Sequence, residues 1–199
     1  MAKAHLSDIR SLIDRLGFGS VRAGRCLLLA KEWARRPPCK KKRYGMANYP
    51  EFHQGLNVKE DECLDEYDPR FAWEIAGFPG VGPYSMDSWR IFCRDELRGK
   101  ATDWKGTGAP PSLPSFLPEW KQVVPRDKEL CAYLSWMWLK EGFIWNHGTG
   151  ETTRASGKMM RAAKKGRVAM VEIGDAMGIS EITIKKAERM DYTMLKLGL

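Results

Sequence analysis

The chain has 199 residues, with 33 lysines and arginines against 25 aspartates and glutamates, so its formal net charge at pH 7 is +8. No apolar run reaches the roughly 18 residues of a membrane-spanning helix, and the pattern of a secretory signal is absent. Five widely spaced cysteines and three isolated histidines argue against a disulfide framework or a zinc site and favour an intracellular compartment. The basic balance favours a polyanionic partner without identifying it.

The first predicted elements are two helices joined by a short turn. Apolar residues recur at helical spacing over 6–15 and again over 20–34, with a turn at 17–19 between them. Residues 34–57 are rich in proline, lysine and tyrosine, which predicts a loop. Within this loop, residues 35–43 concentrate six cations, which could act as a nuclear address, a phosphate contact or a solvated segment.

Residues 77–93 are the most informative stretch. Two glycines flank one apolar residue in Gly80-Val81-Gly82, and an amphipathic helix follows. Glycine lets the backbone approach a partner closely, and the amides at such a turn and at the next helix start suit a phosphate. A dinucleotide fingerprint does not fit, because Ser85 stands where its third glycine is required, and the Gly-Lys-Ser/Thr of a P-loop is also missing.

The segment before this turn predicts another helix. Residues 69–76 carry apolar side chains at helical spacing, with Asp68 as the N-cap and Pro69 at the first helical position. With the turn at 77–83 and a helix over 84–97, the pattern predicts a helix–hairpin–helix. An ordinary connection between two helices is the alternative interpretation.

Four segments resemble a known family. The hairpin Phe78-Pro-Gly-Val-Gly-Pro-Tyr84 resembles that of the helix–hairpin–helix DNA glycosylases, the endonuclease III-like superfamily. The segments Asp87-Ser-Trp-Arg-Ile-Phe-Cys93 and Glu119-Trp-Lys-Gln-Val-Val-Pro-Arg-Asp127 are similar, more narrowly, to the thymine/uracil glycosylase domain of the methyl-CpG-binding-domain protein. Residues 16–25 resemble the family's turn and helix that touch DNA. The resemblance covers roughly residues 6–146.

This resemblance implies a monofunctional DNA N-glycosylase that flips mismatched thymine or uracil out of G·T and G·U pairs in base-excision repair. It implies an all-α fold, double-stranded DNA as partner, a monomer, a nuclear location and no cofactor. Asp127 is implied as the catalytic carboxylate beside the sugar, although an aspartate in a first helical turn is also a common helix-dipole partner. Tyr84 occupies the place of the Schiff-base lysine of bifunctional relatives, which implies a base-pocket role and no lyase activity.

The resemblance also assigns the DNA-binding residues. Gly80, Val81, Gly82 and Ser85 are expected to hold the DNA backbone, and hairpin carbonyls could share a K⁺ or Na⁺ with a phosphate. A metal site made of side chains is not expected. Phe18 occupies the position of a family residue that wedges into the duplex, or else it is an apolar cap on the helix that follows it.

Nearly every predicted element is helical, so the sequence predicts an all-α fold. Residues 99–118, rich in glycine and proline, predict an irregular insertion, and a helix is expected over 126–141. Residues 6–146 are predicted to form the glycosylase-like domain. The family's domain starts with helices that have no counterpart before Leu6, so this domain is expected to be truncated at its amino terminus.

The remaining residues, 147–199, predict a basic C-terminal extension that could be helical. Residues 173–186 faintly resemble a helix-turn-helix, and a basic tail is the alternative. Three functions therefore compete: the glycosylase, a non-catalytic helix–hairpin–helix DNA-binding protein or glycosylase remnant, and a small basic regulator that reads DNA through 173–186.

Overall fold

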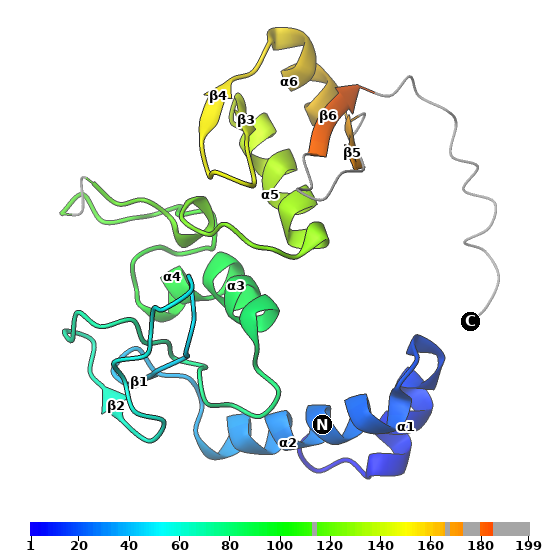
Figure 1. Ribbon diagram of the computed structural model, residues 1–199, viewed down its shortest axis with the longest axis vertical. Coiled ribbons are helices and arrows are strands. Elements are labelled where there is room, and N and C mark those ends of the chain that lie inside the picture. Colours follow the sequence, from blue (N-terminus) through cyan, green and yellow to red (C-terminus); the bar gives the residue numbers. More distant parts are fainter. Residues whose placement is uncertain (113–114, 166–167, 173–179, 185–199) are drawn as a thin grey trace. The chain divides into compact units, whose positions relative to one another are not determined.

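Helices dominate the chain, with small two-stranded antiparallel sheets beside them. The sequence predicted an all-α fold, and the structure confirms that helices predominate but adds strands that were not predicted. The chain divides into two compact units, Met1–Val123 and Val124–Leu199, so the predicted domain 6–146 contributes to both. The computed structural model describes the backbone of residues 1–112, 115–165, 168–172 and 180–184 (Figure 1).

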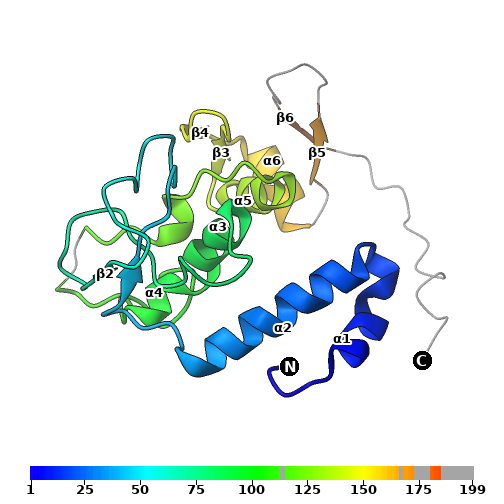
Figure 2. The same cartoon turned by 60° about the horizontal axis from the view of Figure 1, so that its bottom comes forward.

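The chain begins with a helical hairpin. Helix α1 (Leu6–Ile13) continues into the 3₁₀ turn η1 (Asp14–Leu16), and helix α2 (Gly19–Arg35) lies beside α1 (Figure 2). The structure therefore confirms the helices expected over 6–15 and 20–34, with small shifts of their ends. The buried residues of this pair are Ile9, Gly19 and Ala23.

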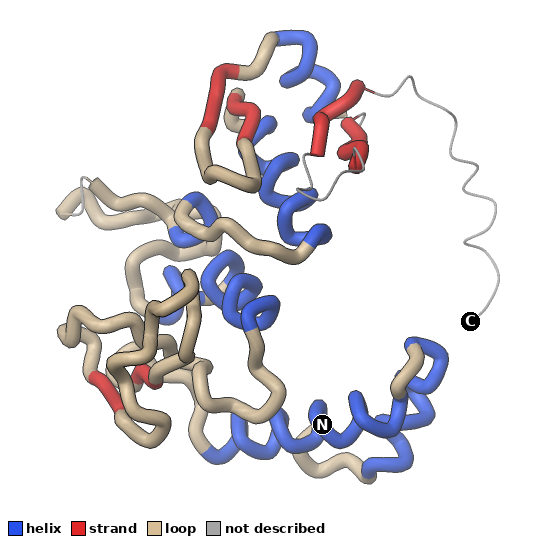
Figure 3. The backbone as a smooth tube through the Cα atoms, viewed as in Figure 1, coloured by secondary structure: helices blue, strands red, loops and turns tan. Residues whose placement is uncertain are grey.

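Residues 69–76 do not form the predicted helix, so the first half of the predicted helix–hairpin–helix is wrong. The chain is extended as far as Trp73, whose backbone exchanges hydrogen bonds of 2.9 and 3.0 Å with that of Tyr44. Turns follow, and Figure 3 shows this part of the chain as loop. Asp68, the expected N-cap, instead accepts from the backbone N–H of Arg70 (2.9 Å) and from its guanidinium (2.8 Å). Tertiary pairing has overridden a local helical pattern.

A buried arginine organises the long loop between α2 and the next helix. Strands β1 (Arg43–Tyr44) and β2 (Cys63–Leu64) pair antiparallel within this loop. Because the loop has little regular structure, its carbonyl groups need other donors. The Arg43 guanidinium donates hydrogen bonds of 2.5 to 3.5 Å to the carbonyl oxygens of Asp65, Asp68 and Arg70.

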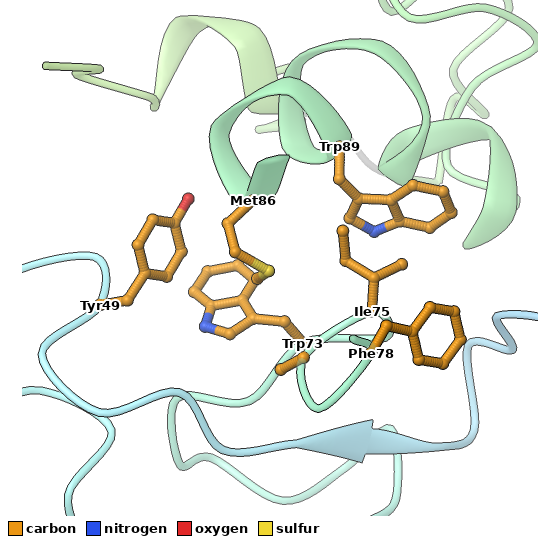
Figure 4. Close-up of a cluster of buried hydrophobic side chains, with 7 residues drawn as sticks. Tyr49, Trp73, Ile75, Phe78, Met86 and Trp89 are labelled. Atoms are coloured by element: carbon orange, nitrogen blue, oxygen red, sulfur yellow. The ribbon is translucent and has the colours of Figure 1, made fainter. Parts of the chain in front are cut away.

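Helix α3 (Pro83–Phe92) covers the main core of the first unit. Gly82 is its N-cap, and Pro83 takes the first position, where a missing N–H costs no helical bond. The expected helix over 84–97 is broken at Cys93 and resumes as the short α4 (Arg94–Leu97). Each large side chain buried here stabilises the fold by about 1.5–3 kcal/mol. The core cluster (Figure 4) consists of Tyr49, Trp73, Ile75, Ala76, Phe78, Met86 and Trp89.

A buried ion network lies next to this core. The Glu119 carboxylate accepts from Arg90 Nε at 2.8 Å and from Arg94 Nη1. Arg94 also pairs with Glu74 at 3.1 Å, and both guanidiniums lie over the Trp73 ring, 4.7 and 4.6 Å from its centroid. Burial acts to raise the pKa of the Glu119 carboxyl, but the charges of Arg94 and Arg90 outweigh it and hold that pKa below its ordinary value.

The connection from α4 to the 3₁₀ turn η2 (Glu119–Lys121) is the irregular insertion that its glycines and prolines predicted. Its described part, 98–112 and 115–118, contains neither helix nor strand. The insertion is fixed where it ends, because the buried carboxylate of Asp95 accepts from the backbone N–H of Glu119 at 2.8 Å. Burial raises the pKa of Asp95.

In the second unit, helix α5 (Lys128–Lys140) confirms the helix expected over 126–141. Strands β3 (Phe143–Trp145) and β4 (Thr152–Arg154) form a hairpin after it, and helix α6 (Gly157–Lys164) packs against α5. Most side chains of the apolar stripe on α5 point inward. Buried residues of this unit include Leu130, Cys131, Leu134, Met137, Leu139, Trp145, Ala162 and Ala163.

The described end of the chain is a pair of strands. Strand β5 (Val168–Glu172) pairs antiparallel with β6 (Ser180–Ile184). The latter belongs to the segment 173–186 that faintly resembles a helix-turn-helix, so that prediction is wrong for these five residues. The rest of that segment lies outside the described residues, as does part of the predicted extension 147–199. In the described part of the chain, no helix is both long and apolar enough to cross a membrane.

Candidate DNA-binding surface and catalytic carboxylate

The glycine turn, residues 77–82, ends in a group of open backbone donors. The N–H groups of Gly82, Tyr84 and Ser85 have no acceptor among the described residues. They stand at the start of α3, where the aligned peptide dipoles place partial positive charge. Such donors are suited to an anion, as the sequence pattern predicted.

The two glycines of this turn have different roles. Gly80 has a φ of +77°, a conformation that favours glycine, so the backbone itself requires it. Gly82 is extended, with φ −131° and ψ −173°, and a Cβ there would meet no protein atom within 4 Å. The fold does not need glycine at position 82. Glycine there does, however, leave the backbone open to a partner that approaches from outside.

Two arginines that the sequence interpretation did not single out lie near the turn, one on α2 and one at its C-terminal end. Gly80 has no Cβ, but a methyl group built there would lie 3.8 Å from the Cβ and Cδ atoms of Arg25. Arg36 donates to the Gly77 carbonyl at 3.1 Å and lies over the Phe78 ring, 4.8 Å from its centroid. Arg25 is exposed and forms no ion pair with any described residue, so it adds a free positive charge beside the turn.

Phe18 lies at the start of the same helix. Its backbone is left-handed, with a φ of 52°, and its side chain is 82% exposed rather than packed as a cap on α2. Phe18, Arg22 and Arg25 recur at the spacing of one helix face. Seven residues of helix separate Phe18 from Arg25, about 10 Å at ~1.5 Å per residue. The two segments assigned to DNA from the sequence therefore meet through α2.

Tyr84 and Asp87 lie one turn apart on α3 in opposite surroundings. Tyr84 is 56% exposed and directly follows the glycine turn, so its ring is accessible. Asp87 is buried and accepts from the hydroxyl of Tyr49 at 2.7 Å. Burial raises the pKa of Tyr49, which keeps its phenol protonated as a donor. Asp87 therefore links α3 to the preceding loop and is not available for chemistry.

Asp127 is the N-cap of α5. Its Oδ1 accepts from the backbone N–H groups of Glu129 (2.9 Å) and Leu130 (3.1 Å), which fixes the carboxylate at the start of the helix. The Cys131 thiol donates to the Pro125 carbonyl at 3.0 Å and ties the preceding chain to α5. Asp127 is half-buried, and its Oδ2 has no partner among the described residues, so one carboxylate oxygen is held and the other is available.

The predicted site residues thus fall into two groups. Phe18, the glycine turn and Tyr84 belong to the first unit, whereas Asp127 belongs to the second. Comparison with protein-family models, with curated proteins and with solved structures finds no match. The functional assignment therefore depends on the residues of this chain.

The basic run 35–43 is largely used within the fold. Its first two arginines pair with Glu32, and Arg43 is buried in the loop described above. Lys41 and Lys42 are exposed at a turn and form no ion pair with a described residue. The run is therefore not a continuous exposed strip of cations.

The predicted cation on the hairpin carbonyls stays a prediction. The carbonyl oxygens of Gly77, Phe78 and Gly82 already accept hydrogen bonds from protein donors. A K⁺ or Na⁺ would use the other carbonyls of the turn or the second lone pairs of these three. Among the described side chains, no three histidines, cysteines or carboxylates gather into a metal site.

Proposed function

We propose that this protein is a monofunctional DNA N-glycosylase that removes mismatched thymine or uracil from duplex DNA in the nucleus. The proposal is supported by the resemblance over residues 77–93 and 119–138. The structural observation that carries it is the hydrogen bond of 3.1 Å from Arg36, at the end of α2, to the Gly77 carbonyl at the start of the glycine turn. This bond joins α2, which follows Phe18, to the glycine turn, and it supports a joint role of the two segments in DNA binding.

In this proposal the first unit holds the damaged strand. The open amides of Gly82, Tyr84 and Ser85 bind a phosphate, and the charge of Arg25 strengthens that contact. Phe18 enters the base stack when the target nucleotide leaves it. Unstacking costs a few kcal/mol and costs least at a mismatch, which favours G·T and G·U pairs as substrates.

Asp127 supplies the chemistry. As the bond between sugar C1′ and the base nitrogen breaks, positive charge develops on the sugar, and a fixed carboxylate stabilises it. The same carboxylate orients a water molecule, whose oxygen bonds to C1′ while the base leaves with the bonding electrons and takes up a proton. Tyr84 has no amine that could form a Schiff base with the sugar, so the strand is not cleaved.

The substitution Asp127→Asn tests the proposal. Asparagine is as good an N-cap as aspartate, so α5 should be retained while the charge is lost. Single-turnover release of thymine from a G·T duplex should fall by about 10²–10³-fold, the usual effect of removing one transition-state contact. Duplex binding should be unchanged. Glu129→Gln, an exposed charge in the same helical turn, is the matched control and should keep base release.

A non-catalytic DNA-binding protein is the second candidate, and the missing helix over 69–76 favours it. In the family's motif two helices frame the hairpin, whereas here a loop that ends in turns precedes it. This alternative predicts salt-dependent duplex binding by the wild-type chain and no release of thymine or uracil at any enzyme concentration. Equal base release by wild type and Asp127→Asn would contradict the role given to this carboxylate.

A further inference from the structure

Helix α6 has two faces of opposite character. Its buried residues are Ala162 and Ala163, and α6 contacts α5. Four cations lie between residues 158 and 165. At ~100° per residue, they fall within an arc of about 120° on the side of the helix away from the two alanines. All four are exposed. This α6 basic face consists of Lys158, Arg161, Lys164 and Lys165.

The α6 basic face has almost no counter-charge. Residues 151–165 contain five cations and a single carboxylate, that of Glu151. None of the four cations forms an ion pair with a described residue. By contrast, the partly exposed Arg70 pairs with both Glu62 and Asp68. The face is therefore a local excess of positive charge.

The needs of the helix do not explain this charge pattern. Lys158 stands in the first turn, where the helix dipole disfavours a cation and where no acidic residue occurs. Arg161 has like charges three residues before it and four residues after it, and such neighbours repel one another. Only the cations of the last turn suit the dipole. The pattern weakens the isolated helix, which points to an anion outside the chain.

We propose that the α6 basic face binds the sugar–phosphate backbone of duplex DNA, as a contact additional to the glycine turn. The inference rests on the proposed function, which makes duplex DNA the partner. Along the helix, Lys158, Arg161 and Lys165 are separated by about 4.5 and 6 Å. Duplex DNA carries one phosphate charge per ~1.7 Å of axis, so each cation can reach one. Such contacts add affinity without sequence preference.

The test is a salt titration of the full chain with Lys158, Arg161 and Lys165 all replaced by glutamine, which keeps a high helix propensity. Binding to a mismatch-free duplex is followed by fluorescence anisotropy. Loss of three phosphate contacts should make the slope of log K against log salt shallower by about 2.7. Over the tenfold range from ~1 M to ~0.1 M salt, this difference in slope corresponds to an association constant up to about 500-fold lower for the variant at ~0.1 M. The two association constants should converge towards ~1 M salt.

The matched control replaces Lys3, Arg10 and Lys59 by glutamine, which removes an equal number of exposed charges from the first unit. Its slope should stay within about one contact of wild type, roughly 0.9. An equal change in both variants would mean that net charge alone matters and would overturn the inference. An unchanged slope in the α6 variant would overturn it as well.

Base release by the wild-type chain is measured separately, so the two proposals can fail independently. Duplex binding that depends on α6 without base release keeps this inference and rejects the glycosylase. Base release by the wild-type chain, together with an unchanged salt slope in the α6 variant, keeps the glycosylase and rejects this inference. Binding to phosphatidylserine vesicles that requires α6, with duplex binding independent of it, would assign the face to a lipid surface instead. A wild-type chain that binds no duplex at all would reject both.

Discussion

The substitution Glu119→Gln should destabilise the first unit strongly. The side chains of Glu119, Arg90 and Arg94 are at most 9% exposed, and glutamine keeps the volume of glutamate while it removes the charge between the two guanidiniums. Arg94 still has Glu74, but Arg90 loses its carboxylate and stays buried. An uncompensated buried charge costs about 3–5 kcal/mol, a large share of the ~5–15 kcal/mol that stabilises a typical protein.

Urea unfolding followed by tryptophan fluorescence measures this loss, since Trp73 and Trp89 lie in the adjoining core. The matched control is Glu62→Gln, which breaks a glutamate–arginine ion pair that is about one-third exposed. Water and salt screen that pair, so its loss should change the free energy of unfolding far less. The expected result is a clear fall in the urea midpoint for Glu119→Gln alone.

The pH dependence gives an independent measurement of the same interaction. The pKa of Glu119 is held below its ordinary value in the folded chain, whereas in the unfolded chain it returns to about 4.3. The stabilisation is therefore complete above the unfolded value and disappears as the pH falls through the folded one. The difference between wild type and Glu119→Gln should be constant from about pH 6 to 8 and shrink below about pH 4.

A loss as small as that of Glu62→Gln would refute this reasoning. It would mean that water reaches the Glu119 carboxylate, or that the two arginines can turn towards solvent. A pH-independent difference would point to altered packing instead of charge. Either outcome would remove the argument that this network holds the end of the insertion against α3.

Three further predictions concern the proposed DNA-binding surface. Gly82→Ala should change the free energy of unfolding by no more than about 0.5 kcal/mol, because a poorer N-cap and a stiffer unfolded chain offset each other. It should nevertheless weaken duplex binding, because the added methyl group covers the open amides. Gly80→Ala, strained at positive φ, should instead lower the melting temperature. Phe18→Ala should leave the melting temperature unchanged, because the ring is exposed, and should reduce thymine release more than duplex binding. A fall in melting temperature with unchanged thymine release would show that Phe18 serves the fold.

The sequence predicted the helices whose signals are local. Helix α2 was expected over 20–34 and spans Gly19–Arg35. Its signal is local, because the apolar pattern that predicts it lies within the helix itself. Helix α5 begins directly after Asp127, whose side chain caps it as an aspartate at that position should. No distant partner is needed to form either helix.

The segment 69–76 failed because its signal was ambiguous. Phe71, Ala72, Ile75 and Ala76 fit a helical face, but most of them are equally well buried by an extended segment followed by a turn. Pairing with Tyr44, far away in the sequence, decided between the two, and a local pattern does not contain that information.

The hairpin of β3 and β4 had a signal that went unused. Phe143, Ile144 and Trp145 are typical of a strand, and the following Asn146 to Gly150 are typical of a turn. In the structure the Asn146 side chain accepts from the N–H of Gly148 at 2.8 Å, as such turns do. For the candidate site, the residues came from the resemblance, whereas the packing of α2 on the glycine turn required the structure.

Arg43 shows that the identity of a residue can matter more than its charge. A lysine there would still be a cation, but its ammonium lacks the planar set of donors of a guanidinium. It could not bind at the same time the three carbonyl groups that lie 22 to 27 residues further along the chain. Those carbonyls would then be left without partners inside the protein. Position 43 should therefore tolerate no other amino acid. Loss of this one guanidinium would loosen a loop in which strands β1 and β2 pair through only two residues each.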